Sequence, residues 1–275
     1  MARKLTKNQI QNFQKEVWDY YGKFGRHELP WRKTTNPYRI LVSEIMLQQT
    51  QVERVKNYYP KFLKAFPNWK ALAASPLKDL LLMWQGMGYN RRALFLARAA
   101  QAVIKSYEGK LPRETSKLIE LPGIGRATAG AVLAYAYNIP VPFIETNVRR
   151  VFIYHFFHGK NGVDDKDILP LVEQTLPREN AREWYWALMD YGTMLKATVP
   201  NPNRNSKHYV RQSIFEGSRR QLRAKILKSL LLGSATFTDL AQKTNIAELD
   251  LKKLLAQLTA EGFINKENNI YLIKT

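Results

Sequence analysis

Apolar residues recur every three or four positions along most of the chain, and short breaks containing proline and glycine separate the runs. This spacing predicts an amphipathic helix over residues 8–24 and a succession of further helices as far as residue 195. The run 39–66 is too long for one uninterrupted helix, and its Pro60 predicts a break near that residue. No long alternation of apolar and polar residues, as strands would show, interrupts this part. We therefore predict an all-α fold over residues 1–195.

The pattern changes after Leu195. Residues 196–217 are rich in asparagine, proline and basic residues and have no apolar periodicity, which predicts a linker or extended loop. Residues 218–275 then predict three helices and two short strands around the turn Lys266–Asn269. Three helices and a terminal hairpin are the layout of a small winged-helix-like domain, although a generic helical cap would have the same layout.

The composition narrows the classes of partner and chemistry. The 275 residues are 45% hydrophobic, enough for a sizeable core, and carry 43 Lys and Arg against 23 Asp and Glu, a net charge of +20. This charge favours a polyanion such as nucleic acid, ahead of an anionic membrane surface. We find neither an apolar run of transmembrane length nor a signal-peptide pattern. The absence of cysteine excludes disulfides, thiolate zinc sites and cysteine-ligated iron–sulfur clusters.

A glycine-containing turn, Leu121–Gly125 (LPGIG), precedes an alanine-rich helical run. Gly123 and Gly125 allow the positive φ angles that a tight turn requires. The first amides of the following helix have no partner within it, and the helix dipole adds positive charge, so a phosphate can bind there. Arg126 and Thr128 could add side-chain contacts. The turn fits a helix-hairpin-helix phosphate clamp, and an ordinary turn between two helices is the alternative.

Six motifs occur in a fixed order over residues 29–192: LPWR, PYRILVSEIMLQQTQV, GMGYNRRA, LPGIGRATAG, ETNVRR and WALMDYG. Together they resemble the helix-hairpin-helix (HhH-GPD) DNA glycosylase superfamily, and most closely its adenine DNA glycosylases of the MutY type. The resemblance implies a two-lobed helical domain that binds double-stranded DNA and hydrolyses an N-glycosidic bond. It does not extend to the C-terminal part of the chain.

Glu44 stands in an apolar run, among Ile40, Leu41, Val42, Ile45 and Met46. Burial there would raise the pKa of the carboxyl group and keep it protonated at neutral pH. A neutral carboxylic acid can donate a proton to a ring nitrogen of a leaving purine. The resemblance implies the same role, since Glu44 matches the general acid of the family's SE-x-MLQQT motif. The alternative is a surface acid on the wet face of its helix, beside the glutamines that follow.

Glu145 lies in the segment ETNV, where the family has D-G-N-V. The family's aspartate supports or attacks the sugar cation, so the resemblance implies an anionic role for Glu145, beside the helper Asn147. The side chain of Glu145 is one methylene longer, and a misplacement of about an ångström can matter to catalysis. Arg149 and Arg150 follow closely and favour the ionised form. The alternative is an acid that stabilises the dipole at a helix N-terminus.

The resemblance also places residues at the DNA. Gln48 matches a residue that wedges into the base stack, and Tyr89 of GMGY sits where the family approaches the lesion strand. A plain packing or surface role is the alternative for both. The expected DNA-binding residues are Gln48, Tyr89, Gly123, Gly125, Arg126, Thr128 and Arg149, and the expected base-pocket residues are Trp31, Arg32, Ala127 and Trp186.

Several positions depart from the family's pattern. Ala127 stands where relatives resembling endonuclease III carry a Schiff-base lysine, which predicts a monofunctional glycosylase that leaves an abasic site. Trp186 occupies a position where relatives read the adenine edge with Glu or Gln, and an indole can stack but cannot make that paired hydrogen bond. A core role is the alternative for Trp186. Residues 196–217 replace the four cysteines of the family's cluster, so we expect no cofactor. The residues after this segment do not match the family's 8-oxoguanine-recognition domain.

The leading hypothesis is a monofunctional DNA glycosylase that removes adenine, or another purine, from a mispair or lesion. A second hypothesis keeps the mechanism and changes the base to mismatched thymine, uracil or an alkylated purine. A third is a non-catalytic DNA-binding protein, against which the two carboxylates argue because buried acids near phosphates cost desolvation and repel DNA. We expect a cytoplasmic, nucleoid-associated monomer.

Overall fold

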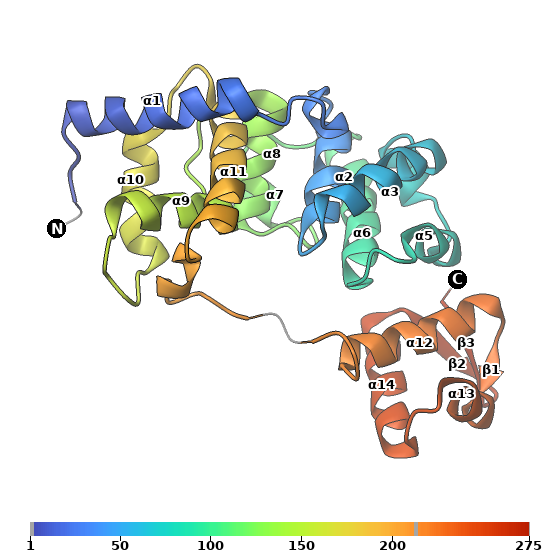
Figure 1. Cartoon of the computed structure of the whole chain (residues 1–275). Helices are drawn as coiled ribbons and strands as arrows, with labels where there is room; N and C mark the ends of the chain where they lie inside the picture. Colours follow the sequence, from blue (N-terminus) through green and yellow to red (C-terminus); the bar gives the residue numbers. More distant parts are fainter. Residues whose placement is uncertain (1–2, 212–213, 275) are drawn as a thin grey trace. The chain divides into compact units, whose positions relative to one another are not determined.

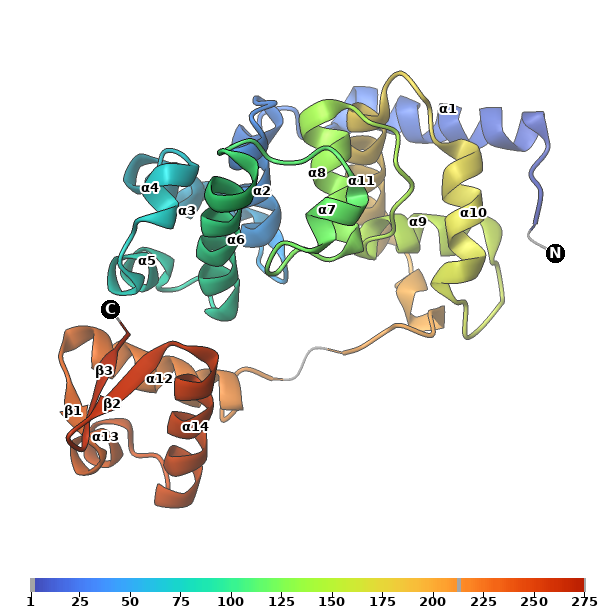
Figure 2. The same ribbon diagram turned by 180° about the vertical axis from the view of Figure 1, so that it is seen from behind.

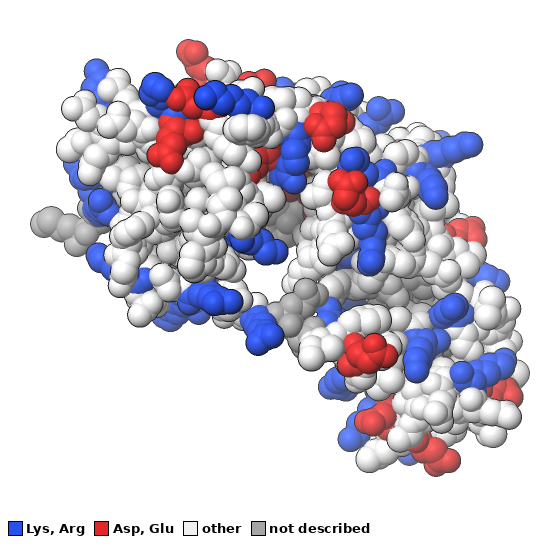
Figure 3. Space-filling view, viewed as in Figure 1, with Lys and Arg blue, Asp and Glu red and all other residues white. Residues whose placement is uncertain are grey.

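The computed structural model describes residues 3–211 and 214–274. The chain forms two compact units, each made of two separate segments: residues 1–44 with 111–211, and residues 45–110 with 212–275. Both units are mainly helical (Figures 1 and 2), which confirms the predicted all-α fold class. No helix in the described part of the chain is long and apolar enough to cross a membrane. Lys and Arg side chains predominate over Asp and Glu on the face in Figure 3.

The first unit is a layered helical assembly around α11. Its elements are α1 (Lys7–Phe24), η1 (Pro30–Arg32), the first part of α2 (Pro37–Leu47), α7 (Thr115–Ile119), α8 (Arg126–Tyr137), α9 (Thr146–Phe156), α10 (Asp165–Thr175), α11 (Ala181–Thr198) and η2 (Pro202–Asn205). Helix α11 lies beside α1, α8 and α9 in both views (Figures 1 and 2). It buries Trp184 and Tyr185 completely, and α9 buries Phe152 against the same core. This packing fixes the start of α9, where the site lies.

The second unit joins helices from the middle of the chain to its C-terminal part. Its elements are α3 (Val52–Ala65), α4 (Trp69–Ala73), α5 (Leu77–Trp84), α6 (Arg91–Tyr107), α12 (Arg219–Leu232), β1 (Ala235–Thr236), α13 (Phe237–Thr244), α14 (Glu248–Glu261), β2 (Ile264–Glu267) and β3 (Ile270–Ile273). The three strands form an antiparallel sheet in the order β1-β3-β2.

The predicted terminal hairpin is confirmed. Ile264 of β2 pairs with Ile273 of β3, and the turn between the strands places Asn268 and Asn269 at φ 46° and 66°. Asparagine tolerates this left-handed region better than most residues, so the turn chemistry specifies the hairpin locally. Thr236 and Asp239 form a reciprocal capping box that begins α13. Together these elements give the winged-helix-like layout expected from the sequence.

The C-terminal helices share a hydrophobic core with the middle of the chain. Leu81 of α5 and Leu94 of α6 pack in one cluster with Ile226 and Leu230 of α12 and Leu254 of α14. The C-terminal part is therefore packed on α5 and α6 rather than separated from them. The division of the chain at residues 195 and 217 stays a prediction, and α11 continues past the first of these positions to Thr198.

The break predicted near Pro60 is wrong. Pro60 lies inside α3, and the run 39–66 is broken instead between the end of α2 and Val52, the first residue of α3. Gln49 has a left-handed φ of 53° at this break. At this break the guanidinium of Arg92 donates to the carbonyl oxygens of Ile45 and Met46 in the last turn of α2, which stabilises the end of the helix.

Candidate active site

The two carboxylates predicted from the sequence both lie in the first unit. Glu44 lies on α2, and Glu145 is the N-cap residue of α9. Burial, followed by the negative charge of Glu145, raises the pKa of Glu44 to about 8, against the opposing charge of Arg32. The effect of Glu145 on this pKa means that the two carboxyl groups are close in space although about a hundred residues apart in sequence. Glu44 is therefore mainly protonated at neutral pH.

Glu145 is surrounded by hydrogen-bond donors. Its Oε1 accepts from the backbone amide of Asn147 and, at 2.8 Å, from that of Val148, while Nδ2 of Asn147 donates to Oε2 at 3.3 Å. Burial raises the pKa of Glu145, and the two backbone hydrogen bonds and the charges of Arg150 and Arg149 oppose this rise. Because these donors stabilise the anion of Glu145, we assign the proton of the pair to Glu44.

The segment before Glu145 is held between two helices. The ring of Phe143 stacks on Tyr185 of α11, with ring centroids 4.0 Å apart, and the backbone amide of Phe143 donates to the Tyr185 hydroxyl at 3.2 Å. That hydroxyl donates in turn to the carbonyl of Val141 at 2.9 Å. On α8, Gly130 approaches so closely that a Cβ there would lie 2.6 Å from that of Phe143. This packing fixes where α9 begins and therefore where Glu145 lies.

Asn147 is placed by the buried Arg150, which the sequence predicted only as a charge that favours the anion of Glu145. Arg150 donates from Nη1 to Oδ1 of Asn147 at 2.6 Å and to the carbonyl of Gly192 at 2.8 Å, and from Nε to Asn201 at 3.1 Å. Gly192 allows α9 and α11 to come this close, since a Cβ there would lie 2.7 Å from that of Asn147. The available signal was the motif ETNVRR, in which Arg150 is three residues after Asn147 and so on the same helix face.

A second charged group lines this region. Arg32 donates to both carboxylate oxygens of Asp190, at 2.7 and 2.8 Å, and Arg26 donates to the same carboxylate at 2.7 Å. Burial raises the pKa of Asp190, but the hydrogen bonds and charges of Arg32 and Arg26 together outweigh burial and hold this pKa below its usual value. Asp190 was also missed from the sequence, although it lies in WALMDYG. It neutralises Arg32 and fixes its guanidinium 5.5 Å from the ring centroid of Trp186.

The predicted base-pocket residues do not share one environment. Trp186 stacks on Tyr135 with ring centroids 5.8 Å apart. Burial, and then the charges of Glu44 and Glu145, raise the pKa of Tyr135, so Trp186 and Tyr135 form a stacked pair near the carboxylates. Trp31 is 6% exposed and belongs to the core. Ala127 lies in the first turn of α8.

The predicted phosphate clamp has the expected turn. Gly123 has φ of 78°, a region that favours glycine. The positive φ expected at Gly125 is wrong, because Gly125 is the N-cap residue of α8 and has the extended backbone usual for that position, with φ −89° and ψ 175°. Gly123, Gly125 and Arg126 are exposed at this N-terminus. Arg149 is bound by Asp165, with hydrogen bonds of 2.7 and 2.6 Å. The contacts of all these residues with DNA stay predictions.

Gln48 and Tyr89 lie in the second unit on two loops joined by Arg92. This buried guanidinium donates to the carbonyls of Gln48 at 2.6 Å, Met87 at 2.9 Å and Gly88 at 3.1 Å. Burial lowers the pKa of Arg92 to about 10, which still leaves it charged at neutral pH. Tyr89 has a left-handed φ of 48°, uncommon for an aromatic residue. The loops of these two residues, both predicted to contact DNA, are thus held together by hydrogen bonds to Arg92, the second arginine of GMGYNRRA.

The segment that replaces the family's cluster loop has no thiolate, so its residues do not fit an iron–sulfur cluster. It is fixed by hydrogen bonds instead. Asn203 is 4% exposed and donates to the carbonyl of Thr146, at the start of α9, at 2.9 Å. The carbonyl of Asn205 accepts from the amide of Val163, and the amide of Lys207 donates to the Val163 carbonyl, both at 2.9 Å. The hydrogen bonds bind this segment to α9 and to the loop before α10.

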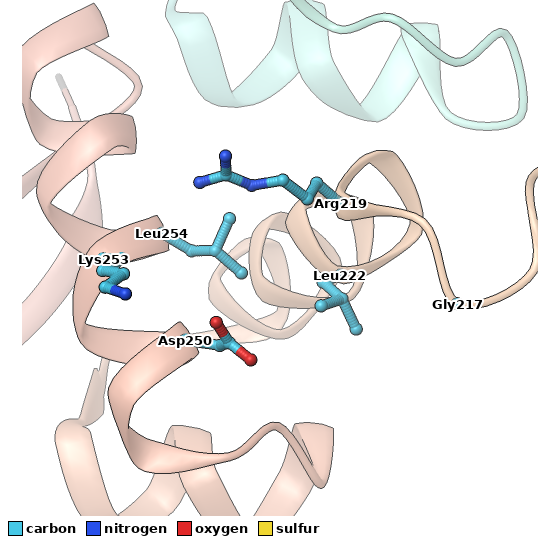
Figure 4. Close-up of a pocket in the computed structure, with 6 residues that line it drawn as sticks. All are labelled: Gly217, Arg219, Leu222, Asp250, Lys253 and Leu254. Atoms are coloured by element: carbon cyan, nitrogen blue, oxygen red, sulfur yellow. The ribbon is translucent and has the colours of Figure 1, made fainter. Parts of the chain in front are cut away.

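A pocket of about 380 Å³ lies in the second unit, between α12 and α14. Figure 4 shows side chains from both helices around it. It is lined by Gly217, Arg219, Leu222, Asp250, Lys253 and Leu254. None of these is a predicted site residue, so we do not place the reaction there.

Comparison with known proteins identifies the family of the chain. A family model described as HhH-GPD superfamily base excision DNA repair protein matches residues 42–175. The adenine DNA glycosylase of Buchnera aphidicola subsp. Baizongia pistaciae is 35% identical over 212 residues, which are 74% of this chain and 60% of that protein. The adenine DNA glycosylase of Mycobacterium tuberculosis (strain ATCC 25618 / H37Rv) is 32% identical over 278 residues, 86% of this chain and 88% of that protein.

A solved structure of a thermostable thymine-DNA glycosylase has a TM-score of 0.62 and 26% identity, covering 73% of this chain and 91% of that one. The chain spans less than two thirds of the Buchnera protein and most of the mycobacterial one. The chain belongs to the HhH-GPD superfamily of base excision DNA repair proteins, as a relative of its adenine DNA glycosylases.

Proposed function

We propose that the protein is a DNA glycosylase of base-excision repair, which hydrolyses the N-glycosidic bond of a flipped-out adenine, or another purine, in a mispair or lesion. The observation that carries this proposal is the carboxylate pair. Glu44 has a pKa of about 8 and holds a proton at neutral pH, while Glu145 is surrounded by donors that stabilise its anion. An acid and an anion side by side are what this reaction requires.

In the proposed reaction Glu44 protonates a ring nitrogen of the flipped base, which then leaves with the electron pair of the glycosidic bond. The sugar becomes an oxocarbenium-like cation, and the carboxylate of Glu145 stabilises it until water adds to C1′ and loses a proton to solvent. Asn147, fixed by Arg150, orients Glu145 through its amide group. The product is double-stranded DNA with an abasic site.

The choice of base is the less constrained part of the proposal. Protonation by Glu44 favours a purine, because a purine leaves best when a ring nitrogen is protonated. Trp186 stacks on Tyr135 and lies beside Arg32, which differs from a pocket that reads the adenine edge through paired hydrogen bonds. The second candidate therefore keeps the mechanism and changes the base, and a solved structure with a similar fold is named as a thymine-DNA glycosylase.

The test is base release from a panel of duplexes that pair adenine, thymine, uracil and alkylated purines with guanine, 8-oxoguanine and normal partners. Release of adenine opposite guanine or 8-oxoguanine is expected. Release of another base alone would overturn the substrate and keep the mechanism. Tight binding without release from any duplex would refute the enzyme and support a DNA-binding protein.

We also propose that the enzyme is monofunctional, because Ala127 offers no amine to attack the sugar. Reaction in the presence of borohydride is expected to leave no protein covalently bound to the DNA, and strand breaks should form only after alkali treatment. The Ala127→Lys variant is the matched positive control, since it places an amine at the same position. Covalent trapping of the unmodified chain would contradict this prediction.

A further inference from the structure

Tyr89 is held from the C-terminal part of the chain as well as from its own loop. Arg220, in the first turn of α12, donates from its guanidinium to the Tyr89 hydroxyl. Its Cζ lies 5.0 Å from the centroid of the Tyr89 ring, and Cζ of Arg92 lies 5.6 Å from the same centroid. The ring is therefore bound by two cations, one from α6 and one from α12.

The helix that carries Arg220 is itself anchored to this face of the unit. Glu261, the last residue of α14, accepts hydrogen bonds from Arg91 of α6 and from Arg223 of α12, the latter at 2.9 Å for Nη1. Arg98 of α6 donates to the backbone carbonyl of Glu261 at 2.9 Å. These contacts, with the shared apolar cluster that includes Leu81 and Leu94, hold α12 against α5 and α6. The position of Arg220 beside Tyr89 is thus a product of the fold of the whole unit.

We propose that Arg220 is a positioning residue for DNA recognition, through which the winged-helix-like domain fixes the Tyr89 ring for insertion into the DNA at the lesion. The inference rests on the proposed function, because it requires Tyr89 to contact DNA. It gives the C-terminal domain a part in discriminating a mispair from a matched pair.

The physical argument concerns the freedom of the ring. Tyr89 leaves the favoured backbone regions, with φ of 48°, and a half-exposed phenol on such a turn would otherwise sample several rotamers. A guanidinium that both bonds the hydroxyl and lies over the ring selects one orientation before DNA binds. Preorganisation of this kind increases the affinity for the complex in which the ring is inserted and leaves non-specific phosphate binding unchanged.

The experiment compares Arg220→Ala with Arg219→Ala in the full chain. Each variant removes one positive charge from the same turn of α12, and Arg219 hydrogen-bonds only weakly, at 3.3 Å, to Gln257. Affinities are measured for a duplex with adenine opposite guanine and for the same duplex with adenine opposite thymine. Arg220→Ala is expected to lower the ratio of the two affinities about tenfold, the scale of a desolvated cation–π contact. Arg219→Ala should lower both affinities alike and preserve the ratio.

Tyr89→Ala separates positioning from a direct contact by Arg220 with DNA. If Arg220 acts through Tyr89, the variant that combines Tyr89→Ala with Arg220→Ala should have the same affinity ratio for the two duplexes as Tyr89→Ala alone. The ratio of Arg220→Lys should lie between those of Arg220→Ala and the wild type. The melting temperatures of the variants report whether the fold is intact. Equal ratios for Arg220→Ala and Arg219→Ala, with a wild type that releases base, would overturn this inference and leave the proposed function standing. A wild type without base release or discrimination would overturn both.

Discussion

Replacement of Glu44 by Gln is expected to lower the single-turnover rate of base release by about 10²–10⁴-fold, the contribution typical of general acid catalysis. The variant keeps the shape of the side chain and removes the proton that a buried carboxylic acid can donate. Its affinity for DNA should be unchanged or slightly higher, because at most a partial negative charge is lost. The measurement is a single-turnover time course on the most reactive duplex of the panel, with binding followed on the same DNA. Equal rates for the two proteins would remove Glu44 from the mechanism.

The wild-type rate should depend on pH in the direction set by the same carboxyl group. Glu44 acts in its protonated form and has a pKa of about 8, so the rate is expected to fall as the pH rises through that value. The free energy of unfolding of the wild type should also fall as the pH rises. Since the pKa is raised from its ordinary value of 4.5, the folded state binds the proton more tightly than the unfolded state between pH 4.5 and about 8.

Stability contributed by this proton is complete below pH 4.5 and is lost as the pH rises towards 8. The Gln variant has no such loss, so the difference in unfolding free energy between variant and wild type should shift in favour of Gln across that window. Urea denaturation of both proteins at pH 5 and pH 9 measures it. A constant difference at the two pH values would mean that Glu44 titrates normally.

The sequence could predict those features of the fold and the site that depend on residues close together in the chain or on a known motif. The turn of the terminal hairpin depends on Asn268 and Asn269, which are adjacent, and the α8 N-terminus depends on the glycines just before it. Both were predictable because the physical cause lies within a few residues. Glu44 and Glu145 were found from their motifs, but the elevation of one pKa by the charge of the other required the fold.

The errors and omissions have long-range causes. Pro60 was expected to end a helix, yet α2 ends earlier, where Arg92, more than forty residues away in the chain, binds the carbonyls of Ile45 and Met46. The role of Asp190 and the contacts of Arg150 with Gly192 and Asn201 were missed because these partners lie on other elements. No local pattern shows that the carbonyl of Gly192 accepts from Arg150. An arginine in a basic chain is by default a candidate for DNA contact, and only tertiary structure shows which arginines are used internally.

Glu145→Gln is expected to lower base release by about 10²–10³-fold, the range for loss of one electrostatic partner of a transition state. The amide oxygen of Gln can still accept from the amides of Asn147 and Val148, so α9 should begin at the same residue and the unfolding free energy should change little. The charge that stabilises the sugar cation is lost. Asp19→Asn is the matched control, because it removes one negative charge from an exposed ion pair with Lys15 on α1.

The same variant tests the coupling of the pair. The negative charge of Glu145 is the second-largest cause of the raised pKa of Glu44, so the Gln variant should lose its residual activity at a lower pH than the wild type. Glu145→Ala removes both the helix cap and the negative charge. It should lower the unfolding free energy by about 1 kcal/mol and also lower the rate of base release. If Glu145→Gln kept the full rate and an unshifted pH profile while Glu145→Ala lost stability, Glu145 would be a helix cap alone. The acid would then have no anionic partner, and the paired-carboxylate mechanism would fail at this residue.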